Sequence, residues 1–155
     1  MVLVTLGTQN QTFYRLLDQI ENSSLQDEII VQAGGSVGYK SKKMKLFSFI
    51  NYEEMQEYIK KADLIITHGG TGSVLFPLEC GKKVIACARL KKYKEHINDH
   101  QCELVSVFGQ EGYILELHDG EALDDVLKKV EKFEPKKYVS NTEHFIECLQ
   151  KEIES

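Results

Sequence analysis

Apolar residues occur along this chain in two alternating patterns. Short unbroken runs rich in β-branched residues are typical of strands that are buried on both faces of a sheet. Six such runs predict strands at residues 2–6, 28–33, 45–49, 63–67, 84–88 and 113–117. The run at 45–49 is the weakest of the six because lysine, serine and phenylalanine interrupt its aliphatic character.

Between these runs, apolar residues recur at the spacing of a helical face. Phe13, Leu16, Leu17 and Ile20 follow the i, i+3, i+4, i+7 pattern. Similar patterns predict helices near 52–62, 74–80, 99–108 and 123–133. A capping-box spacing at 140–143 opens a last predicted helix at about 141–154.

The alternation of strands and helices predicts an α/β fold. We expect a single Rossmann-like, doubly wound parallel sheet of about six strands, with helices on both faces. A length of 155 residues suits one domain spanning 1–155, and the helix at 141–154 would pack on that domain or extend from it. Right-handed crossovers bring the carboxyl ends of parallel strands to one edge, where ligands bind.

Polar or glycine-rich segments follow five of the predicted strands. We expect these segments to converge on one rim of the sheet and to form a nucleotide-type site. They comprise residues 7–9, 32–35, 49–51, 68–73 and 89–101. The segment 89–101 is too polar and charged to be predicted as core.

The segment His68–Ser73 carries three glycines, Gly69, Gly70 and Gly72, between a strand and a helix. Glycine lets a ligand approach the main chain, and the unpaired N–H groups of a helix start bind phosphate. Ser73 could cap that helix or bind the same anion. An ordinary tight connection is the alternative, and the dinucleotide fingerprint is absent because its third glycine would fall at Leu75.

Composition narrows the class of protein. A net charge of −5 argues against a nucleic-acid-binding protein, and the 42% apolar content suffices for a core. No segment is apolar enough to span a membrane, and residues 1–6 lack the basic region of a signal peptide. The four cysteines show no CxxC spacing, which favours a reducing cytoplasm over disulfides or zinc.

Three segments, 4–9, 62–73 and 89–101, together resemble one family of proteins, and the resemblance extends to about Phe133. The family is the small donor-binding, catalytic subunit of bipartite GT-B glycosyltransferases. It includes bacterial exopolysaccharide and capsule enzymes of the PssE/EpsF type and the cytosolic subunit of the two-part dolichol-linked GlcNAc transferase. The segment 89–101 is the most specific of the three motifs.

The resemblance implies a fold equivalent to the C-terminal half of a GT-B enzyme such as the lipid II synthase. It implies transfer of a sugar from a UDP-sugar to a lipid-linked acceptor, in bacterial exopolysaccharide or capsule synthesis or, alternatively, in lipid-linked oligosaccharide synthesis. The acceptor half would be a membrane-anchored partner that recruits this cytoplasmic chain to the inner face of the membrane. Without that partner, the exposed edge could form a homo-oligomer.

The resemblance also implies roles for individual residues. The diphosphate would be held by the turn and by the end of the first strand, the uracil by the main chain of Ile50, and sugar hydroxyls by the last motif. The implied donor-binding set is Gly7, Thr8, Ile50, His68, Gly69, Gly70, Thr71, Gly72, Ser73, Arg89, Asp99, His100 and Gln101. Arg89 would neutralise phosphate charge, with an ordinary surface arginine as the alternative, and His68 is equally consistent with a structural histidine.

No residue stands out as a general base. His68, Glu95 and His96 are weak catalytic candidates, and the base could lie on the partner. No metal or cofactor is expected, because the sequence has no DxD triplet and its histidines are dispersed. Relatives often bind ribose through a glutamate at the position of Phe76, and Glu79 could replace it only if the helix shifts.

Two other classes of function stay open. The chain could be a non-catalytic subunit that stabilises a competent transferase. It could also be a free-standing hydrolase-like domain, although Ser73 lacks the following glycine of a nucleophile elbow. The identity of the donor sugar is open because a single hydroxyl contact decides it.

Overall fold

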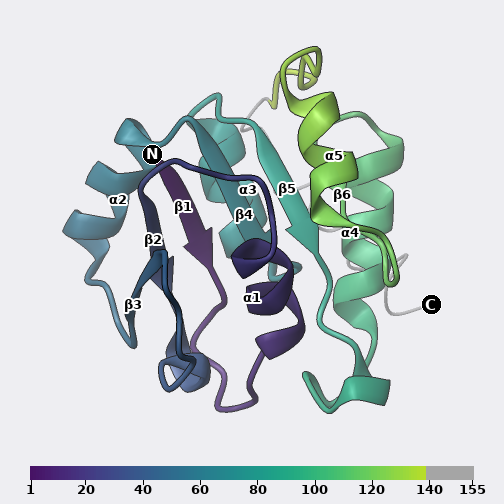
Figure 1. Cartoon of the computed structure of the whole chain (residues 1–155). Helices are drawn as coiled ribbons and strands as arrows, with labels where there is room; N and C mark the ends of the chain where they lie inside the picture. Colours follow the sequence, from purple (N-terminus) through teal and green to yellow (C-terminus); the bar gives the residue numbers. More distant parts are fainter. Residues whose placement is uncertain (139–155) are drawn as a thin grey trace.

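The computed structural model describes residues 1–138, which form one six-stranded parallel sheet (Figure 1). The sheet order is β3-β2-β1-β4-β5-β6, and each neighbouring pair is parallel. The strands are β1 (Val2–Thr5), β2 (Ile29–Gln32), β3 (Met44–Phe47), β4 (Leu64–His68), β5 (Val84–Cys87) and β6 (Leu115–Glu116). The strand order reverses between β1 and β4, which is the switch point of a doubly wound sheet.

Helices cover both faces of the sheet, as the alternation predicts (Figure 1). One face carries α1 (Tyr14–Glu21) and α5 (Leu123–Val130), and the other carries α2 (Tyr52–Lys61), α3 (Thr71–Glu79) and α4 (His100–Gln110). Successive strand residues feed the two cores in turn: Val2 and Val4 pack with α1, whereas Leu3 packs on the opposite side. The predicted fold class is therefore confirmed.

Several boundaries differ from the prediction. β6 has two residues instead of the five at 113–117, because only Leu115 and Glu116 pair with β5 at this edge of the sheet. α3 begins at Thr71, inside the glycine turn, instead of near residue 74. α5 ends at Val130. The helix expected at 141–154 lies outside the described residues.

The strand register aligns the carboxyl ends of the strands at one edge, which is the lower edge in Figure 1. Thr5 is in register with Gln32 on one side and with Thr67 on the other, and His68 is in register with Cys87. Two short 3-10 helices, η1 (Gly34–Ser36) and η2 (Lys91–Tyr93), follow β2 and β5 at this rim. The structure thus brings the polar loops together, as predicted.

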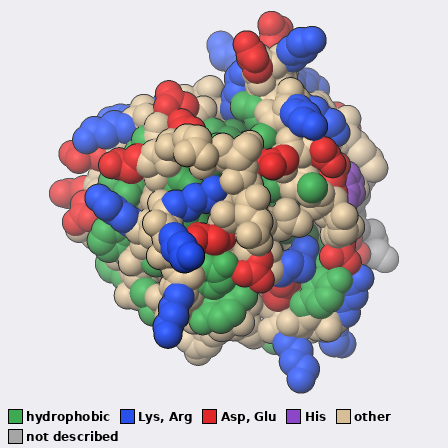
Figure 2. Space-filling model, in the orientation of Figure 1, with side chains coloured by type: hydrophobic (Ala, Val, Ile, Leu, Met, Phe, Trp, Pro, Cys, Tyr) green, Lys and Arg blue, Asp and Glu red, His purple; other side chains and the backbone are tan. Residues whose placement is uncertain are grey.

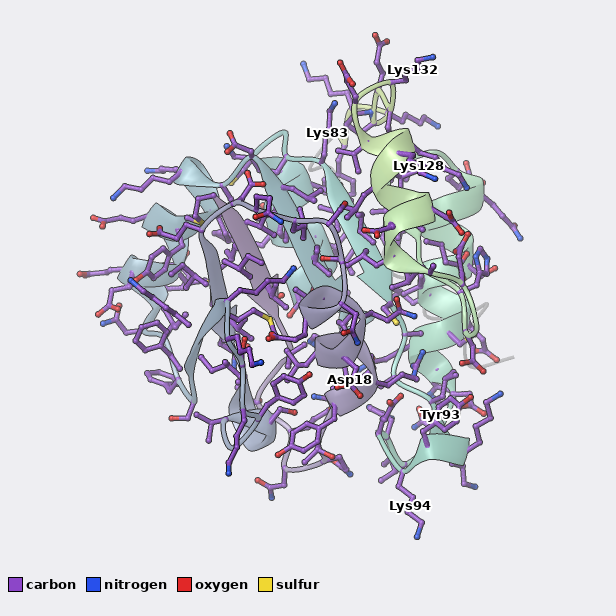
Figure 3. The ribbon with its side chains drawn as sticks, viewed as in Figure 1. Asp18, Lys83, Tyr93, Lys94, Lys128 and Lys132 are labelled. Atoms are coloured by element: carbon purple, nitrogen blue, oxygen red, sulfur yellow. The ribbon has the colours of Figure 1, made fainter. Side chains whose placement is uncertain are left out.

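The surface carries no dominant charge on the face covered by α1 and α5, where acidic and basic side chains are interspersed (Figure 2). Figure 3 shows Tyr93 and Lys94 at the rim and Lys83, Lys128 and Lys132 at the opposite end. Among residues 1–138, no helix combines the length and the apolar character that crossing a membrane requires.

Candidate functional site

The turn after β4 leads directly into the first turn of α3. Gly70 is the N-cap, and the first helical hydrogen bond joins the Val74 N–H to the Gly70 carbonyl at 3.1 Å. The N–H groups of Thr71, Gly72 and Ser73 precede that bond and have no acceptor within the helix. They stand at the positive end of the helix dipole, which is the arrangement that binds a phosphate.

Different physical reasons explain why each of the three positions in the turn is occupied by glycine. A Cβ on Gly69 would lie 2.8 Å from Gln101 Cβ, and one on Gly70 would lie 2.4 Å from His68 Cε1. A Cβ on Gly72 would meet no atom within 4 Å apart from the adjacent residues and the backbone of its own helix. Neighbours within the chain therefore account for Gly69 and Gly70, whereas the open space at Gly72 is where a ligand can approach the main chain.

The end of β1 lies against the same turn. Gly7 has a φ of +80°, and a Cβ there would stand 2.8 Å from His68 Nε2. The Gln32 side chain fixes this residue twice, because its Nε2 donates to the Gly7 carbonyl at 2.9 Å and its Oε1 accepts from the Gly7 N–H at 3.1 Å. Thr8 follows and is exposed at the rim.

Gln32 is a residue that the sequence prediction did not assign a role. Its signal is a polar side chain at the carboxyl end of an otherwise apolar strand, and that chain is only 6% exposed. It holds the β1 loop in place, so it contributes to the site without needing to reach a ligand.

His68 is buried at the end of β4, with 5% of its surface exposed. Its Nε2 lies 3.1 Å from Ser73 Oγ, and within the described residues Nδ1 makes no hydrogen bond. Burial, followed by the positive charge of Arg89, lowers the pKa of His68 to about 4, so the ring is neutral at neutral pH. Ser73 contacts this ring instead of capping α3, and the predicted Ser73 cap is wrong because Gly70 holds that position.

Arg89 is completely buried, so its interpretation as a surface arginine is wrong. Its guanidinium donates to the carbonyls of Leu6 at 2.6 Å, Gln11 at 2.9 Å and Glu95 at 2.9 Å. Burial lowers the pKa of Arg89 to about 10, which still leaves it charged at neutral pH. Both terminal nitrogens of Arg89 thus have carbonyl acceptors, whereas its Nε makes no hydrogen bond within the described residues.

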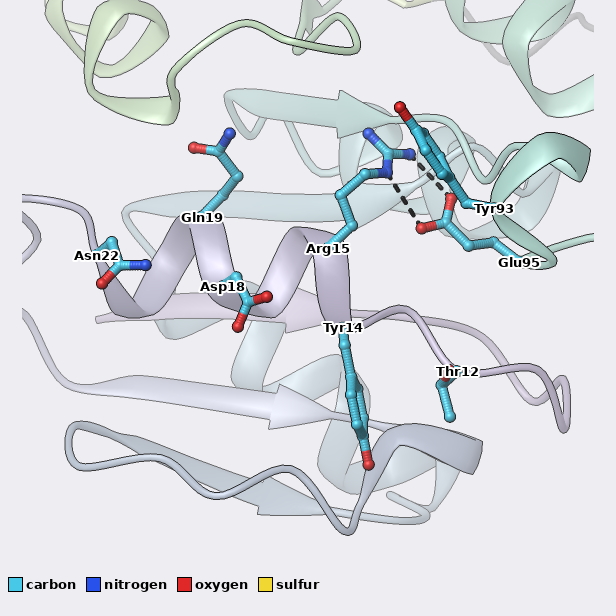
Figure 4. Close-up of a pocket in the computed structure, with 8 residues that line it drawn as sticks. All are labelled: Thr12, Tyr14, Arg15, Asp18, Gln19, Asn22, Tyr93 and Glu95. Atoms are coloured by element: carbon cyan, nitrogen blue, oxygen red, sulfur yellow. Dashed lines mark hydrogen bonds and ion pairs between the residues drawn. The ribbon is translucent and has the colours of Figure 1, made fainter.

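Glu95 is also buried, with 3% of its surface exposed. Arg15 donates to both of its carboxylate oxygens, from Nε at 3.1 Å and from Nη2 at 2.9 Å (Figure 4). A carboxylate engaged in this way is not a free general base. The expectation that 89–101 is too polar for the core is thus wrong for Arg89, Glu95 and Gln101.

Gln101 joins two loops of the rim. Its Oε1 accepts from the Gly69 N–H at 3.1 Å and from the Arg89 N–H at 3.2 Å. Asp99 and His100 are exposed beside it at the start of α4, and Asp99 Oδ1 accepts from the Lys91 N–H at 2.9 Å. The start of α4 thus abuts the glycine turn, with Asp99 and His100 facing solvent.

The remaining catalytic candidate, His96, is half-buried, and its Nδ1 lies 3.3 Å from the Asn98 N–H. No three His, Cys, Asp or Glu side chains within residues 1–138 are placed together to hold a metal ion. Independence from metal stays a prediction.

A mostly apolar cavity of about 210 Å³ opens beside the glycine turn, between α2 and α3. Tyr52 and Phe76 form an edge-to-face pair on its wall, with ring centroids 6.1 Å apart. The full lining is Leu3, Thr5, Gln32, Tyr52, Met55, Gln56, Ile59, Gly72, Ser73, Phe76 and Pro77. The lining contains no charged side chain, and its mostly apolar chemistry suits an aromatic, weakly polar ring.

Ile50 and Glu79 were considered above as contacts for the base and the ribose of a nucleotide. Ile50 is buried directly before the start of α2, where Asn51 caps the helix by accepting from the Glu54 N–H at 2.9 Å. Glu79 instead lines a separate hollow with Lys82 and residues 135–138. It therefore does not take the place of the ribose-binding glutamate that relatives have at the position of Phe76.

A larger, more polar hollow of about 640 Å³ runs along α1, on the opposite face of the sheet (Figure 4). Its lining includes Arg15 and Glu95 but no residue of the glycine turn. Size alone therefore does not single out a candidate anion site, and the helix start with the open space at Gly72 is the stronger candidate.

Comparison with known sequences finds relatives of one kind. The mouse UDP-N-acetylglucosamine transferase subunit ALG13 is 32% identical over 100 residues, covering 62% of this chain and 8% of the relative. The Debaryomyces hansenii protein of the same name is 28% identical over 115 residues, covering 67% of this chain and 54% of the relative. The chain thus spans at most about half the length of these curated relatives.

Solved structures share the fold. An NMR structure of ALG13 covers 99% of this chain and 96% of its own, with a TM-score of 0.61 and 19% identity. MurG of Acinetobacter baumannii covers 97% of this chain and 51% of its own, with a TM-score of 0.58 and 17% identity. The Calicheamicin Glycosyltransferase CalG4 gives a TM-score of 0.57 at 18% identity, covering 99% of this chain and 39% of its own.

The relatives bear on the predicted family. They support the resemblance to the C-terminal half of a GT-B enzyme like ALG13. The curated relatives are eukaryotic proteins, and they do not support the bacterial PssE/EpsF assignment. The Glycosyltransferase family 28 C-terminal domain matches residues 1–153. The chain therefore belongs to the glycosyltransferase family 28 C-terminal domain family.

Proposed function

We propose that this chain is the donor-binding subunit of a two-component glycosyltransferase that uses a UDP-sugar. The observation that carries the proposal is the start of α3, where three N–H groups without helical acceptors meet the open space at Gly72 beside an apolar cavity. A nucleotide needs this combination of an anion site and a site for a flat ring. Gly7 and Thr8 would face the diphosphate from β1, and the Ile50 main chain would meet the base.

The sugar of the donor would lie against the start of α4. Asp99 and His100 are exposed there, and Gln101 lies directly behind the glycine turn. Asp99 and His100 would bind sugar hydroxyls, while Gln101, whose Oε1 already has two donors, would mainly fix the geometry of the site. Arg89 would contribute a buried positive charge beneath the diphosphate.

The named relatives favour one donor. They are called UDP-N-acetylglucosamine transferase subunits, which matches the GlcNAc alternative better than an exopolysaccharide or capsule enzyme. We therefore place UDP-N-acetylglucosamine first among the candidate donors. A lipid-linked sugar would be the acceptor, held by a membrane-anchored partner that recruits this chain to the cytoplasmic face of the membrane.

The general base would be supplied by that partner. Glu95 is engaged by Arg15, and the low pKa of His68 makes its ring a weak base. The isolated chain should then bind nucleotide and transfer little sugar. A non-catalytic role in stabilising the partner is the alternative, and Asp99→Ala separates the two: unchanged transfer by the assembled complex would favour the non-catalytic role.

Calorimetry of the chain with UDP and a panel of UDP-sugars tests the proposal. We expect UDP to bind, and UDP-N-acetylglucosamine to bind more tightly than UDP-glucose, UDP-galactose or UDP-glucuronate. Absence of UDP binding would refute the nucleotide site. Preference for another sugar would refute only the choice of donor.

A further inference from the structure

Arg15 lies outside every motif that carries the proposed function, yet it contacts three residues of the segment between β5 and α4, namely Ala88, Tyr93 and Glu95. It projects from the first turn of α1 toward Glu95, with Tyr93 beside the pair (Figure 4). Its guanidinium carbon also lies 5.0 Å from the Tyr93 ring centroid, and its Nη2 donates to the Ala88 carbonyl at 2.9 Å.

Glu95 connects Arg15 to the backbone of the loop through further hydrogen bonds. Its carboxylate accepts from the Leu90 N–H at 3.0 Å as well as from Arg15, and its carbonyl accepts from Arg89. The loop between β5 and α4 is therefore fixed to α1 by the Arg15–Glu95 pair and by the hydrogen bond from Arg15 to the Ala88 carbonyl. Bidentate arginine–carboxylate pairs impose direction as well as attraction, so they define the loop position closely.

The other loops of the rim are held by different contacts. Gly7 is fixed by Gln32, and the end of β4 by the hydrogen bond of 2.7 Å between Thr5 Oγ1 and Thr67 Oγ1. These contacts do not involve Arg15 or Glu95. The part of the rim that would hold the nucleotide thus has anchors of its own, in addition to the hydrogen bonds of Arg89 and Gln101 that join it to the loop before α4.

We propose that Arg15 is a positioning residue for the donor sugar: by holding Glu95, it fixes the loop that leads to Asp99 and His100. This inference rests on the proposed function and adds that the sugar part and the nucleotide part of the donor should respond differently to a substitution of Arg15. Loss of the pair should weaken binding of the sugar part of the donor and spare the nucleotide part. Arg15 itself does not touch the donor.

The test compares Arg15→Met with Lys92→Met in the full chain. Lys92 lies in the same loop and pairs with Asp119 at 2.7 Å, but it is exposed and does not contact Glu95. We expect Arg15→Met to raise the Kd for UDP-N-acetylglucosamine about tenfold and the Kd for UDP less than about threefold. Lys92→Met should change neither constant. Equal weakening of both ligands, or of neither, would overturn the inference.

Removing Arg15 leaves a buried carboxylate without its partner, which can unfold a protein. Arg15→Lys keeps the charge and loses the bidentate geometry, so it should show the same selectivity to a smaller degree. The double variant Arg15→Met/Glu95→Gln removes both charges, and its effect on sugar affinity should be smaller than the sum of the single effects. Additive effects would show that the two residues do not act as a pair.

Amide hydrogen exchange of the free chain tests the positioning without any ligand. In Arg15→Met, exchange at the Gly69 and Arg89 amides, which donate to Gln101, should accelerate, while the Gly7 amide stays protected. Unchanged exchange at Gly69 and Arg89 would overturn the inference. A wild-type chain that fails to bind UDP would instead refute the proposed function, so the two failures are distinguishable.

Discussion

Replacing Gly72 with alanine adds one methyl group at the point where we place the diphosphate. Apart from the adjacent residues and the backbone of its own helix, no atom of the described residues lies within 4 Å of the new Cβ, and Gly72 is the second residue of α3. The substitution therefore causes no clash in the free protein. It should affect stability and ligand affinity in opposite directions.

The effect on stability follows from helix propensity. Alanine is favoured over glycine by about 0.8–1 kcal/mol in a helix interior, and by about half of that near a helix start. We expect Gly72→Ala to raise the free energy of unfolding by about 0.5 kcal/mol. In a domain of this size that corresponds to an increase in Tm of about 1–2 °C.

The effect on affinity follows from the approach of the ligand. A methyl group here would keep a phosphate from at least one helix-start amide, and a hydrogen bond to a charged group contributes about 1.5–3 kcal/mol. The Kd for UDP should rise about tenfold to a hundredfold. Calorimetry measures this loss, and thermal unfolding of the same sample measures the gain in stability.

Gly109→Ala is the matched control, because Gly109 lies in α4 and its Cβ would lie 3.3 Å from Glu116 Oε2, an atom at the end of a flexible side chain. That variant should leave UDP binding unchanged. A Gly72→Ala protein that is at least as stable as the wild type and binds UDP equally well would refute the placement of the diphosphate.

Three further predictions follow from the site. His68 has a pKa of about 4 in the folded chain and about 6.5 in the unfolded chain, so the free energy of unfolding should fall by about 3 kcal/mol as the pH drops from 6.5 to 4. Urea unfolding of His68→Gln should show a smaller fall over the same pH range, and an equal fall would contradict the assignment of the pH dependence to His68. Arg89→Met leaves two buried carbonyls and one partly buried carbonyl without their donor and should cost at least about 3 kcal/mol in urea unfolding, whereas a loss below about 1 kcal/mol would argue against its role in the core. Phe76→Ala removes one wall of the apolar cavity and should weaken binding of UDP about fivefold without affecting inorganic pyrophosphate; equal loss for both ligands would place the base elsewhere.

The fold and the rim could be predicted from sequence because they depend on local patterns. Strands such as Val2–Thr5 are buried on both faces and therefore read as unbroken apolar runs. The right-handed crossover rule then brings the loops to one edge without any knowledge of individual contacts. The weakest boundary, at β6, fails because Tyr113 and Ile114 are buried without joining the ladder.

The interior of the site could not be predicted in this way. Arg89, Glu95 and Gln101 look solvated in sequence, but they have partners such as Leu6 and Arg15 that are distant in the sequence. The glycine spacing likewise suggested that Gly69, Gly70 and Gly72 all make room for a ligand. In the structure, close contacts with Gln101 and His68 explain Gly69 and Gly70, and within the turn only Gly72 is left open to a ligand. Tertiary contacts of this kind have no local signature.

The most direct test of the central claim is a titration of the ¹⁵N-labelled chain with UDP, followed by ¹⁵N–¹H correlation spectra. Our account predicts that the amides of Thr71, Gly72, Ser73 and Thr8 shift together with UDP, and that uridine without phosphate leaves them largely unmoved. Asn22, at the far end of the hollow along α1, should not respond to either ligand. Saturable UDP shifts confined to the α1 hollow, with the α3 amides unchanged, would contradict the account.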